Sequence, residues 1–393
     1  MHKPTIKGGL AGSGFAARFH FDALTRVHGV ELQIAGIWSP TAPHAEAFGR
    51  ERGIPVLRDY DELLEAVDVV HLCTPPASHE PLALRALAAG RWVVIEKPLT
   101  GYFGDGSESF SADGMDRRVA LKEACASIER LLAAERRSRG RILYAENWVY
   151  APAIQKEREI LEKTGGQILW MLGGESHSGS HSPTYGLWRF SGGGSLMGKA
   201  CHPLAGALYL KQVEGRARDG RPIRPATVSC RTHAITRMPA FRDEGHLRTG
   251  YHDVEDFAQA HVVFDDGTVA DLFASELVLG GVHNFLEVAA NNHRARININ
   301  PNDALLTYNP VETNFSDIYV VEKIGTKQGW APTSPDEAWF TGYQHEMEAF
   351  YRAVARDEAP ESGGPLGADC IATIYAAYVS AQHGGLETPV PRL

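Results

Sequence analysis

Glu96-Lys97-Pro98 is the first candidate for chemistry, because it places an ammonium group directly after a predicted buried strand. The four residues before it, 92–95, are all apolar, which is typical of a parallel strand covered on both faces. Open α/β sheets bind ligands beyond the carboxyl ends of their strands. A partly buried lysine shifts its pKa readily, so Lys97 is a candidate proton carrier. The alternative is a surface lysine that caps the strand.

A second candidate is the run 12–17, which has the spacing G-x-G-x-x-A. It lies between a predicted strand over 5–11 and a segment with helical apolar periodicity, the context in which this spacing binds dinucleotides. Gly12 allows the tight turn and Gly14 the close approach of the backbone to a pyrophosphate. The helix N-terminus offers free N–H groups and a favourable dipole to the phosphates. We therefore expect cofactor contacts at Gly12, Gly14, Phe15 and Ala16.

The predicted second strand, over 32–38, should end at the residue that holds the adenosine ribose. An acidic residue there indicates NAD and a nearby arginine NADP, but the chain has Ser39, so NAD is favoured and NADP stays possible. His79 follows another strand end, and it either faces the cofactor or caps the next helix. The further predicted cofactor contacts, all at strand ends, are Thr74, Pro75, His79, Glu96, Lys97, Asn147 and Trp148.

A polar run over 175–181 contains Glu175, His177 and His181 among several hydroxyl groups. Such side chains suit carbohydrate recognition, since each can hydrogen-bond a sugar hydroxyl. The same three residues could instead hold a divalent metal together with His202, or form an ordinary polar loop. Trp188 and Arg189 follow, and the indole is interpreted either as a stacking face for a sugar ring or as a core residue.

Helices and strands alternate through the first part of the chain, which predicts a doubly wound parallel sheet, a Rossmann domain, over residues 1–147. Within it, 101–117 is an aperiodic insertion loop, expected to be a lid or an oligomer contact. Residues 148–393 read as an α+β substrate-binding domain with an open, mainly antiparallel sheet packed on helices. A sheet covered on one face predicts a homodimer or homotetramer through the other.

Composition narrows the class of protein. The chain has 393 residues and a net charge of −9, which argues against binding nucleic acid. Its five cysteines are scattered and never in CxxC spacing, which favours reduced thiols and a cytoplasmic location. No apolar run approaches the roughly 20 residues that a membrane span requires.

Taken together, the motifs resemble the Gfo/Idh/MocA family of NAD(P)-dependent sugar oxidoreductases. GLAGSGFAARFH, TPPASH, EKPL, AENW and GGGSLMGKACHP occur in the family's order and rough spacing, over nearly the whole chain. The resemblance implies that Lys97 lies near the nicotinamide and the reacting hydroxyl. It also implies a helix after the GGG turn that carries an Asp and, four residues on, a His on the same face.

The chain departs from that pattern, because the Asp position is Gly198 and only the His, His202, is kept. Hydride transfer from an alcohol needs one positioned base, so the expected catalytic pair is Lys97 and His202, with either as the base. We hypothesise that the lost carboxylate makes room for a larger substrate, with Lys199 facing the pocket. A carboxylate within 251–256 could also replace it. The expected substrate contacts are Lys97, His177, His181, Trp188, Arg189, Lys199 and His202.

Three functions fit these expectations. The leading one is a dehydrogenase that oxidises or reduces a ring hydroxyl of a sugar, cyclitol or glycoside. A second is a lyase or glycosidase that uses transient oxidation and elimination with no net redox change. A third is a cofactor-binding sensor without catalysis.

Overall fold

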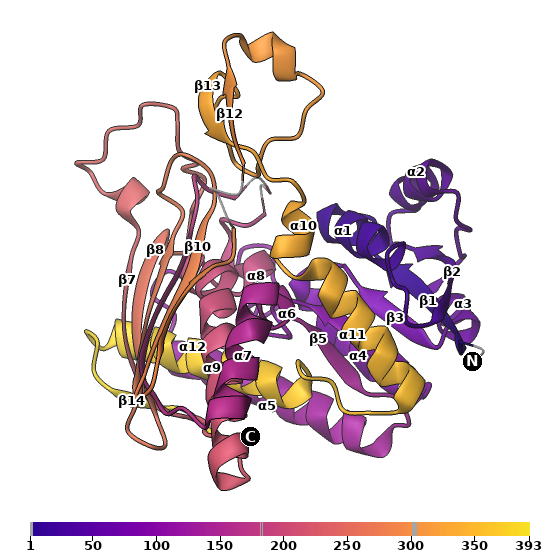
Figure 1. Cartoon of the computed structure of the whole chain (residues 1–393), viewed down its shortest axis with the longest axis horizontal. Coiled ribbons are helices and arrows are strands. Elements are labelled where there is room, and N and C mark those ends of the chain that lie inside the picture. The colour runs from indigo at the N-terminus through magenta and orange to yellow at the C-terminus, as the bar shows by residue number, and fades with distance from the viewer. Residues whose placement is uncertain (1–2, 181, 183, 301–304) are drawn as a thin grey trace.

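The computed structural model describes residues 3–180, 182, 184–300 and 305–393. Its N-terminal part is a five-stranded parallel sheet with the order β2-β1-β3-β4-β5 (Figure 1). The strands are β1 (Thr5–Ala11), β2 (Glu31–Trp38), β3 (Val69–Leu72), β4 (Trp92–Glu96) and β5 (Ile142–Ala145). The helices between them are α1 (Phe15–Leu24), α2 (Ala42–Arg52), α3 (Tyr60–Ala66), α4 (His79–Ala88) and α5 (Arg117–Arg137). The predicted Rossmann domain is confirmed.

The second sheet has seven strands in the order β11-β10-β6-β9-β8-β7-β14. All its neighbouring pairs are antiparallel except β6 with β9. The mainly antiparallel sheet expected for the second domain is confirmed. Its strands are β6 (Ile168–Ser176), β7 (Pro225–His233), β8 (Phe257–Phe264), β9 (Val269–Ser275), β10 (His283–Ala290), β11 (Arg294–Asn298) and β14 (Thr388–Pro389).

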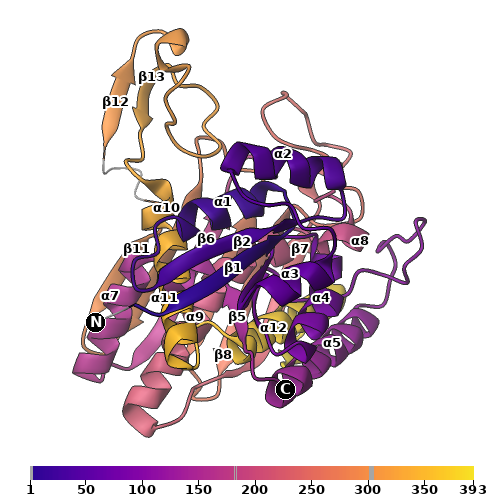
Figure 2. The same ribbon diagram turned by 90° about the vertical axis from the view of Figure 1, so that its right-hand side faces the viewer.

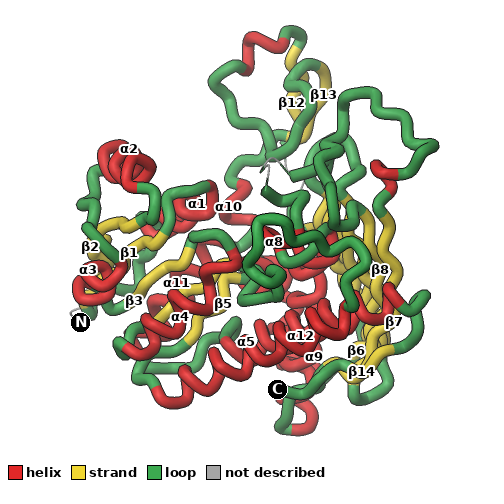
Figure 3. Tube along the Cα trace, turned by 180° about the vertical axis from the view of Figure 1, so that it is seen from behind, coloured by secondary structure: helices red, strands yellow, loops and turns green. Residues whose placement is uncertain are grey.

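Two long helices, α9 (Cys201–Asp219) and α12 (Gly364–Gln382), cover one face of the second sheet and stand between it and the Rossmann domain (Figures 1 and 3). The side chains on this face, such as Met171, Leu272 and Val288, are buried. The shorter helices of this part are α6 (Asn147–Tyr150), α7 (Pro152–Thr164) and α8 (Trp188–Ser191). The two sheets thus share one layer of helices between them.

The C-terminal helices return to the Rossmann domain. α12 packs against α5, and α11 (Tyr343–Arg356) packs against α1. A bridge also joins Leu143 of β5 to Gly363. The division at residue 147 therefore stays a prediction, because the chain crosses between the two parts again after its middle third.

Two segments have sequence patterns that the structure does not follow. The segment 338–356 has the pattern of one helix, but the structure has two, α10 (Glu337–Phe340) and α11, separated at Gly342. The segment 318–322 has the pattern of a strand, but its apolar residues Val320 and Val321 pack on Ala331 instead of joining a ladder. That segment belongs to an arm that projects from the body and carries the hairpin of β12 (Leu306–Asn309) and β13 (Gly329–Pro332) (Figure 2).

The insertion loop at 101–116 forms no helix or strand, as expected, but it is tied to the second domain. The Ala112 amide donates to Asp253, and the Trp188 indole donates to the Tyr102 carbonyl at 2.8 Å. Gln382 of α12 donates to the Met115 carbonyl. These hydrogen bonds tie the loop to the second domain of the same chain, so the loop is not a free lid. Among the described residues, no helix combines the length and apolar character needed to cross a bilayer.

Candidate active site

The glycine-rich loop after β1 has the geometry of a phosphate-binding turn. Gly12 has a φ of +104°, and a Cβ there would lie 2.5 Å from the Cys73 carbonyl oxygen, so only glycine fits. A Cβ added at Gly14 would meet nothing within 4 Å. Gly14 is the N-cap of α1, and no side chain caps that helix end. The open space over the free helix N-terminus, beside the switch point between β1 and β3, fits a dinucleotide.

The remaining predicted cofactor residues surround this loop in different ways. Ser39 lies 3.3 Å from the Ser13 hydroxyl, at the end of β2. Phe15 is 67% exposed, and its ring contacts Phe19 at 4.7 Å, so it stands at the open rim of the site. Ala16 packs against the core. These placements agree with contacts to a bound dinucleotide, which stay a prediction.

His79 is buried behind the loops that follow β3 and β4. Its Nδ1 lies 2.9 Å from the Pro98 carbonyl oxygen and its Nε2 lies 3.0 Å from the Thr74 carbonyl oxygen. Ser78 donates to the Thr74 hydroxyl, which further orders the loop containing Pro75. Burial lowers the pKa of His79, while its two carbonyl partners act to raise it. Its position braces the two loops from within, in place of the predicted direct cofactor contact.

Glu96 anchors the strand end that carries the candidate lysine. It accepts from the Lys97 amide at 2.9 Å, and its other oxygen lies 2.9 Å from His20 Nε2. The chain of hydrogen bonds continues from His20 Nδ1 to His71 Nδ1 and from His71 Nε2 to the Tyr351 hydroxyl, each over 3.0 Å. Burial would raise the pKa of Glu96, but the bond and charge of His20 hold it below its ordinary value. Glu96 therefore holds the backbone of Lys97 in position, and its predicted contact to a cofactor stays a prediction.

Lys97 reaches out of the Rossmann domain and donates to the Gly198 carbonyl at 2.8 Å. Burial alone would lower the pKa of Lys97, but the neighbouring Cys201, Tyr185 and Glu175 side chains raise it above its ordinary value. The pKa of Lys97 is therefore shifted upward, and not downward as a proton-carrying lysine requires. Lys97 remains an ammonium ion at neutral pH, and its chemistry is to stabilise negative charge and donate hydrogen bonds.

The acceptor of this bond lies in a single π-helical turn, residues Leu196–Ala200, that leads directly into α9. Such turns inside helices are frequent at functional sites. Glu255 holds its start, accepting from the Leu196 amide at 2.9 Å and from the Gly194 amide at 3.2 Å. The turn presents the Gly198 carbonyl to Lys97 and places His202 in the first turn of α9.

His202 is paired with a glutamate that sequence reasoning did not select. Its Nδ1 lies 2.6 Å from Glu146 Oε1, at the end of β5, and its ring stacks on Trp148. Burial lowers the pKa of His202 to about 4, and burial raises the pKa of Glu146 to about 8. The pair is therefore uncharged at pH 7. The Nε2 atom of His202 points toward Glu175, whose carboxylate oxygen lies 3.9 Å away. Burial also raises the pKa of Glu175.

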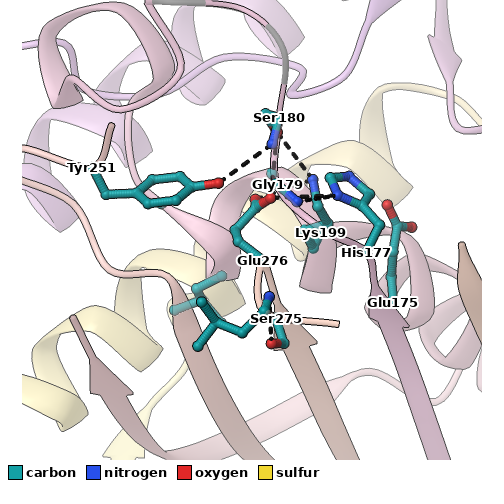
Figure 4. Close-up of polar contacts among 12 residues, drawn as sticks. Glu175, His177, Gly179, Ser180, Lys199, Tyr251, Ser275 and Glu276 are labelled. Carbon is teal, nitrogen blue, oxygen red and sulfur yellow. Dashed lines mark hydrogen bonds and ion pairs between the residues drawn. The ribbon is translucent and has the colours of Figure 1, made fainter. Parts of the chain in front are cut away.

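The polar run after β6 gathers around a buried ion pair (Figure 4). Lys199 Nζ lies 3.1 Å from Glu276, and it donates to the Ser180 hydroxyl at 3.3 Å. His177 Nδ1 accepts from the Gly179 amide at 2.9 Å and lies 3.6 Å from Glu276. Lys199 and His177 thus share Glu276, and Glu175 lies close to them (Figure 4); their contacts to a substrate stay a prediction. His181 lies outside the described residues.

Three predicted contacts have structural work instead. Trp188 is fully buried, and the Arg117 guanidinium covers its ring at 4.1 Å, so the core interpretation holds and the sugar-stacking one is wrong. The Arg189 guanidinium lies over the neighbouring Phe190 ring. Asn147 is buried and donates to the Thr341 carbonyl at 2.7 Å, so it joins α6 to the C-terminal part; its contact to a cofactor stays a prediction.

No carboxylate of 251–256 replaces the missing aspartate, because each one fixes backbone elsewhere. Asp253 accepts from the Trp188 amide, Glu255 from the Leu196 amide, and Asp256 from the Thr236 amide. The expected room at Gly198 is also absent, because a Cβ there would overlap the hydroxyl oxygen of Tyr185. Tyr185 sits in an irregular segment without any motif, so the sequence offered no signal for it.

The metal set weighed from the sequence includes His181, which lies outside the described residues. The described residues that present ligand atoms within 4.8 Å of one another are Glu146, Cys201 and His202. The 2.6 Å contact between Glu146 and His202 is a hydrogen-bond distance, and the Lys97 ammonium acts electrostatically on both side chains. This geometry favours proton exchange over metal binding.

Fold and site define a Rossmann dinucleotide-binding protein whose second domain contributes a histidine opposite an EKP lysine. Residues 6–112 match the Gfo/Idh/MocA oxidoreductase family with its NAD-binding Rossmann fold. Residues 6–112 thus match the NAD-binding Rossmann fold of that family, and the resemblance inferred from the motifs is confirmed over this part of the chain.

Three individual proteins are similar to this chain in fold or in sequence. GenD2 from gentamicin A biosynthesis, solved in complex with NAD, superposes with a TM-score of 0.77 at 21% identity, over 100% of this chain and 98% of that one. Inositol 2-dehydrogenase 4 of Saccharopolyspora erythraea is 41% identical over 24% of this chain and 27% of its own. Glycosyl hydrolase family 109 protein 2 of Phocaeicola vulgatus is 25% identical over 47% of this chain and 48% of its own. The chain thus spans about half or less of these two curated relatives.

Proposed function

We propose that the protein is an NAD(P)-dependent dehydrogenase acting on a ring hydroxyl of a sugar, cyclitol or glycoside. The observation that carries the proposal is the bond from Lys97 to the Gly198 carbonyl, which joins the end of β4 to the turn that presents His202. It supports the proposal because it links the carboxyl end of a Rossmann strand to the turn that carries Lys199 and leads to His202. The names of the similar proteins, which include an inositol dehydrogenase, support this substrate class.

The residues divide the work as follows. Gly12 and Gly14 hold the dinucleotide, which supplies hydride acceptance and donation when bound. The Lys97 ammonium hydrogen-bonds the reacting oxygen and stabilises its negative charge as the hydroxyl is oxidised. His202, kept in place by Glu146 and Trp148, orients the same hydroxyl. Glu175, His177 and Lys199 bind the neighbouring hydroxyls of a polyol.

The first experiment follows reduced-nicotinamide absorbance and substrate loss together, on a panel of sugars, cyclitols and glycosides with NAD+ or NADP+. We expect the two signals to rise in step. Lys97→Ala should lower kcat/KM by about 100-fold or more, because it removes the charge that stabilises the alkoxide. Lys163→Ala is the matched control, since that lysine is exposed on α7. Wild-type rates in Lys97→Ala would refute the assignment.

A second function is favoured by one observation. Glu175 is buried, its Oε2 has no hydrogen-bond partner among the described residues, and burial raises its pKa. Simple hydride transfer does not need this additional acid next to His202. An oxidation–elimination–reduction cycle does need an acid, to protonate a glycosidic leaving group.

The same panel separates the two functions. Substrate loss without net nicotinamide reduction would support the cycle, and Glu175→Gln should then abolish glycoside cleavage while leaving hydride exchange with the ring carbon. Loss in step with reduction would support the dehydrogenase. A protein that binds the dinucleotide and turns over nothing would be a sensor.

The location and assembly of the protein belong to the same proposal. We infer a cytoplasmic protein, in keeping with five cysteines that are all unpaired. We also infer a homodimer or homotetramer formed through the uncovered face of the second sheet.

A further inference from the structure

The site needs a proton acceptor, and His202 is poorly suited to the task. The pKa of about 4 that burial gives His202 makes it a weak base, and Glu146, protonated at pH 7, donates to its Nδ1. The imidazole proton then lies on Nε2, which faces the site as a donor. Lys97 keeps its positive charge and is needed to stabilise the charge on the reacting oxygen. Neither of the two residues predicted from the sequence is therefore assigned the proton transfer.

Tyr185 occupies the place that the missing carboxylate would take. A Cβ added at Gly198 would overlap the Tyr185 hydroxyl oxygen, so the phenol fills the space where a side chain at 198 would begin. In the resembled family this position carries an aspartate. The phenol comes from the irregular segment before α8.

The Tyr185 hydroxyl is also unused by the fold. Its oxygen is buried and has no hydrogen-bond partner among the described residues. A buried hydroxyl without a partner costs free energy, so such groups call for an explanation. A substrate hydroxyl or carbonyl between Tyr185 and Lys97 would supply the missing partner.

Two cations face the phenol and would stabilise its ionised form. The charge of Lys97 acts to lower the pKa of Tyr185, and the Lys199 ammonium lies 5.0 Å from the centre of its ring. Three acidic or weakly acidic groups oppose them, namely Glu276, Cys201 and Glu175, and burial outweighs all of these effects. The pKa of Tyr185 is thus raised, and the resting phenol is neutral.

We propose that Tyr185 is the proton-transfer residue of this site, with Lys97 as its electrostatic partner; the inference rests on the proposed dehydrogenase function. In carbonyl reduction the phenol O–H bond breaks and its proton forms the substrate O–H bond; the dinucleotide, when bound at Gly12 and Gly14, would supply the hydride for the carbon. The two ammonium groups stabilise the phenolate that remains. In oxidation the phenolate takes the hydroxyl proton, and the bound dinucleotide would accept the hydride.

Tyr185→Phe tests the proposal because it removes only the hydroxyl. We expect kcat to fall by about 100-fold or more, with the NAD+ dissociation constant, measured by fluorescence titration, changed by less than about twofold. In the wild type the oxidation rate should rise with pH as the phenol ionises, and this limb should disappear in Tyr185→Phe. Tyr251→Phe is the matched control: its hydroxyl contacts the Ser180 amide, and kcat should stay within about threefold.

An exchange variant and a stability cycle test the spatial claim. Tyr185→Ala combined with Gly198→Asp should regain at least about tenfold of the kcat lost in Tyr185→Ala. In the protein without cofactor, Gly198→Ala should lower the Tm when Tyr185 is present. In the Tyr185→Ala background it should lower the Tm far less, because the overlap is gone.

Each contrary result has a distinct meaning. If Tyr185→Phe keeps the wild-type kcat and pH profile, or Tyr185→Ala changes only KM, Tyr185 is a volume filler and the inference is wrong. Additive Tm changes in the cycle would also overturn it. If the wild type turns over no member of the panel with either cofactor, the proposed function itself fails.

Discussion

At the scale of single residues, the buried pair of Glu146 and His202 should control how stability depends on pH. Glu146 has a pKa of about 8 when folded, against an ordinary 4.5, so it contributes stability at low pH that is lost as the pH rises to about 8. His202 has a folded pKa of about 4, against an ordinary 6.5, so its contribution is lost as the pH falls below 6.5. Between about pH 4.5 and 6.5 the two effects cancel.

Above pH 6.5 only the Glu146 effect remains. We expect the free energy of unfolding to fall by up to about 1.4 kcal/mol per pH unit between pH 6.5 and 8. Glu146→Gln should remove this decline, because the amide does not titrate. Urea unfolding at several pH values in this window would measure it. Glu159→Gln is the control, since it is exposed and titrates at acid pH. An equal slope in Glu146→Gln would contradict the assignment.

The residues found from the sequence are those whose function depends on local spacing. The turn at Gly12 and the lysine after β4 are encoded by neighbours in the chain, so motif and strand pattern suffice to predict them. Glu146 contacts His202, more than 50 residues away, and Tyr185 contacts Gly198, more than 10 residues away. No rule of local spacing predicts such contacts. Trp188 is a case in which the local sequence does not suffice. An aromatic residue near a glycine turn gives the same sequence pattern whether its side chain is buried or exposed.

At the scale of elements, periodicity predicted most strands and helices, and it failed where a partner decides the outcome. The segment 318–322 has strand-like residues but no neighbouring edge to pair with. The break between α10 and α11 arises at Gly342, where φ is +98° and a Cβ would overlap the Asn147 carbonyl oxygen and lie 2.6 Å from the Ala151 amide nitrogen. Helical periodicity continues through this glycine, so the close approach cannot be read from the sequence.

The break makes a direct prediction for Gly342→Ala. The side chain adds both left-handed backbone strain and a steric clash with α6, so the free energy of unfolding should fall by more than about 2 kcal/mol. Gly53→Ala is the matched control. It also has a positive φ, +66°, but open space around it, and should cost only about 1 kcal/mol. Similar urea midpoints for the two variants would show that the approach to α6 is not restrictive.

At the scale of the whole molecule, the seven-stranded sheet leaves one face without helices. Trp170 and Phe285 lie on this face, each 39% exposed, while residues of the opposite face pack on α9 and α12. Antiparallel register places Phe285 opposite Gly174 of β6, two pairs along from Glu287 and Leu172, so these side chains form one surface. An uncovered sheet face of this kind is stabilised by burying it against another copy.

We therefore expect Trp170→Glu and Phe285→Glu to weaken self-association by about 100-fold or more, since each would bury an unpaired charge in the interface. Light scattering after size-exclusion chromatography, over a range of concentrations, would give the mass of each variant. Val119→Glu, at an exposed apolar position on α5 of the Rossmann domain, should keep the wild-type mass. If the wild type itself is monomeric at micromolar concentration, the sheet face has no second copy to bind, and the predicted oligomer is wrong.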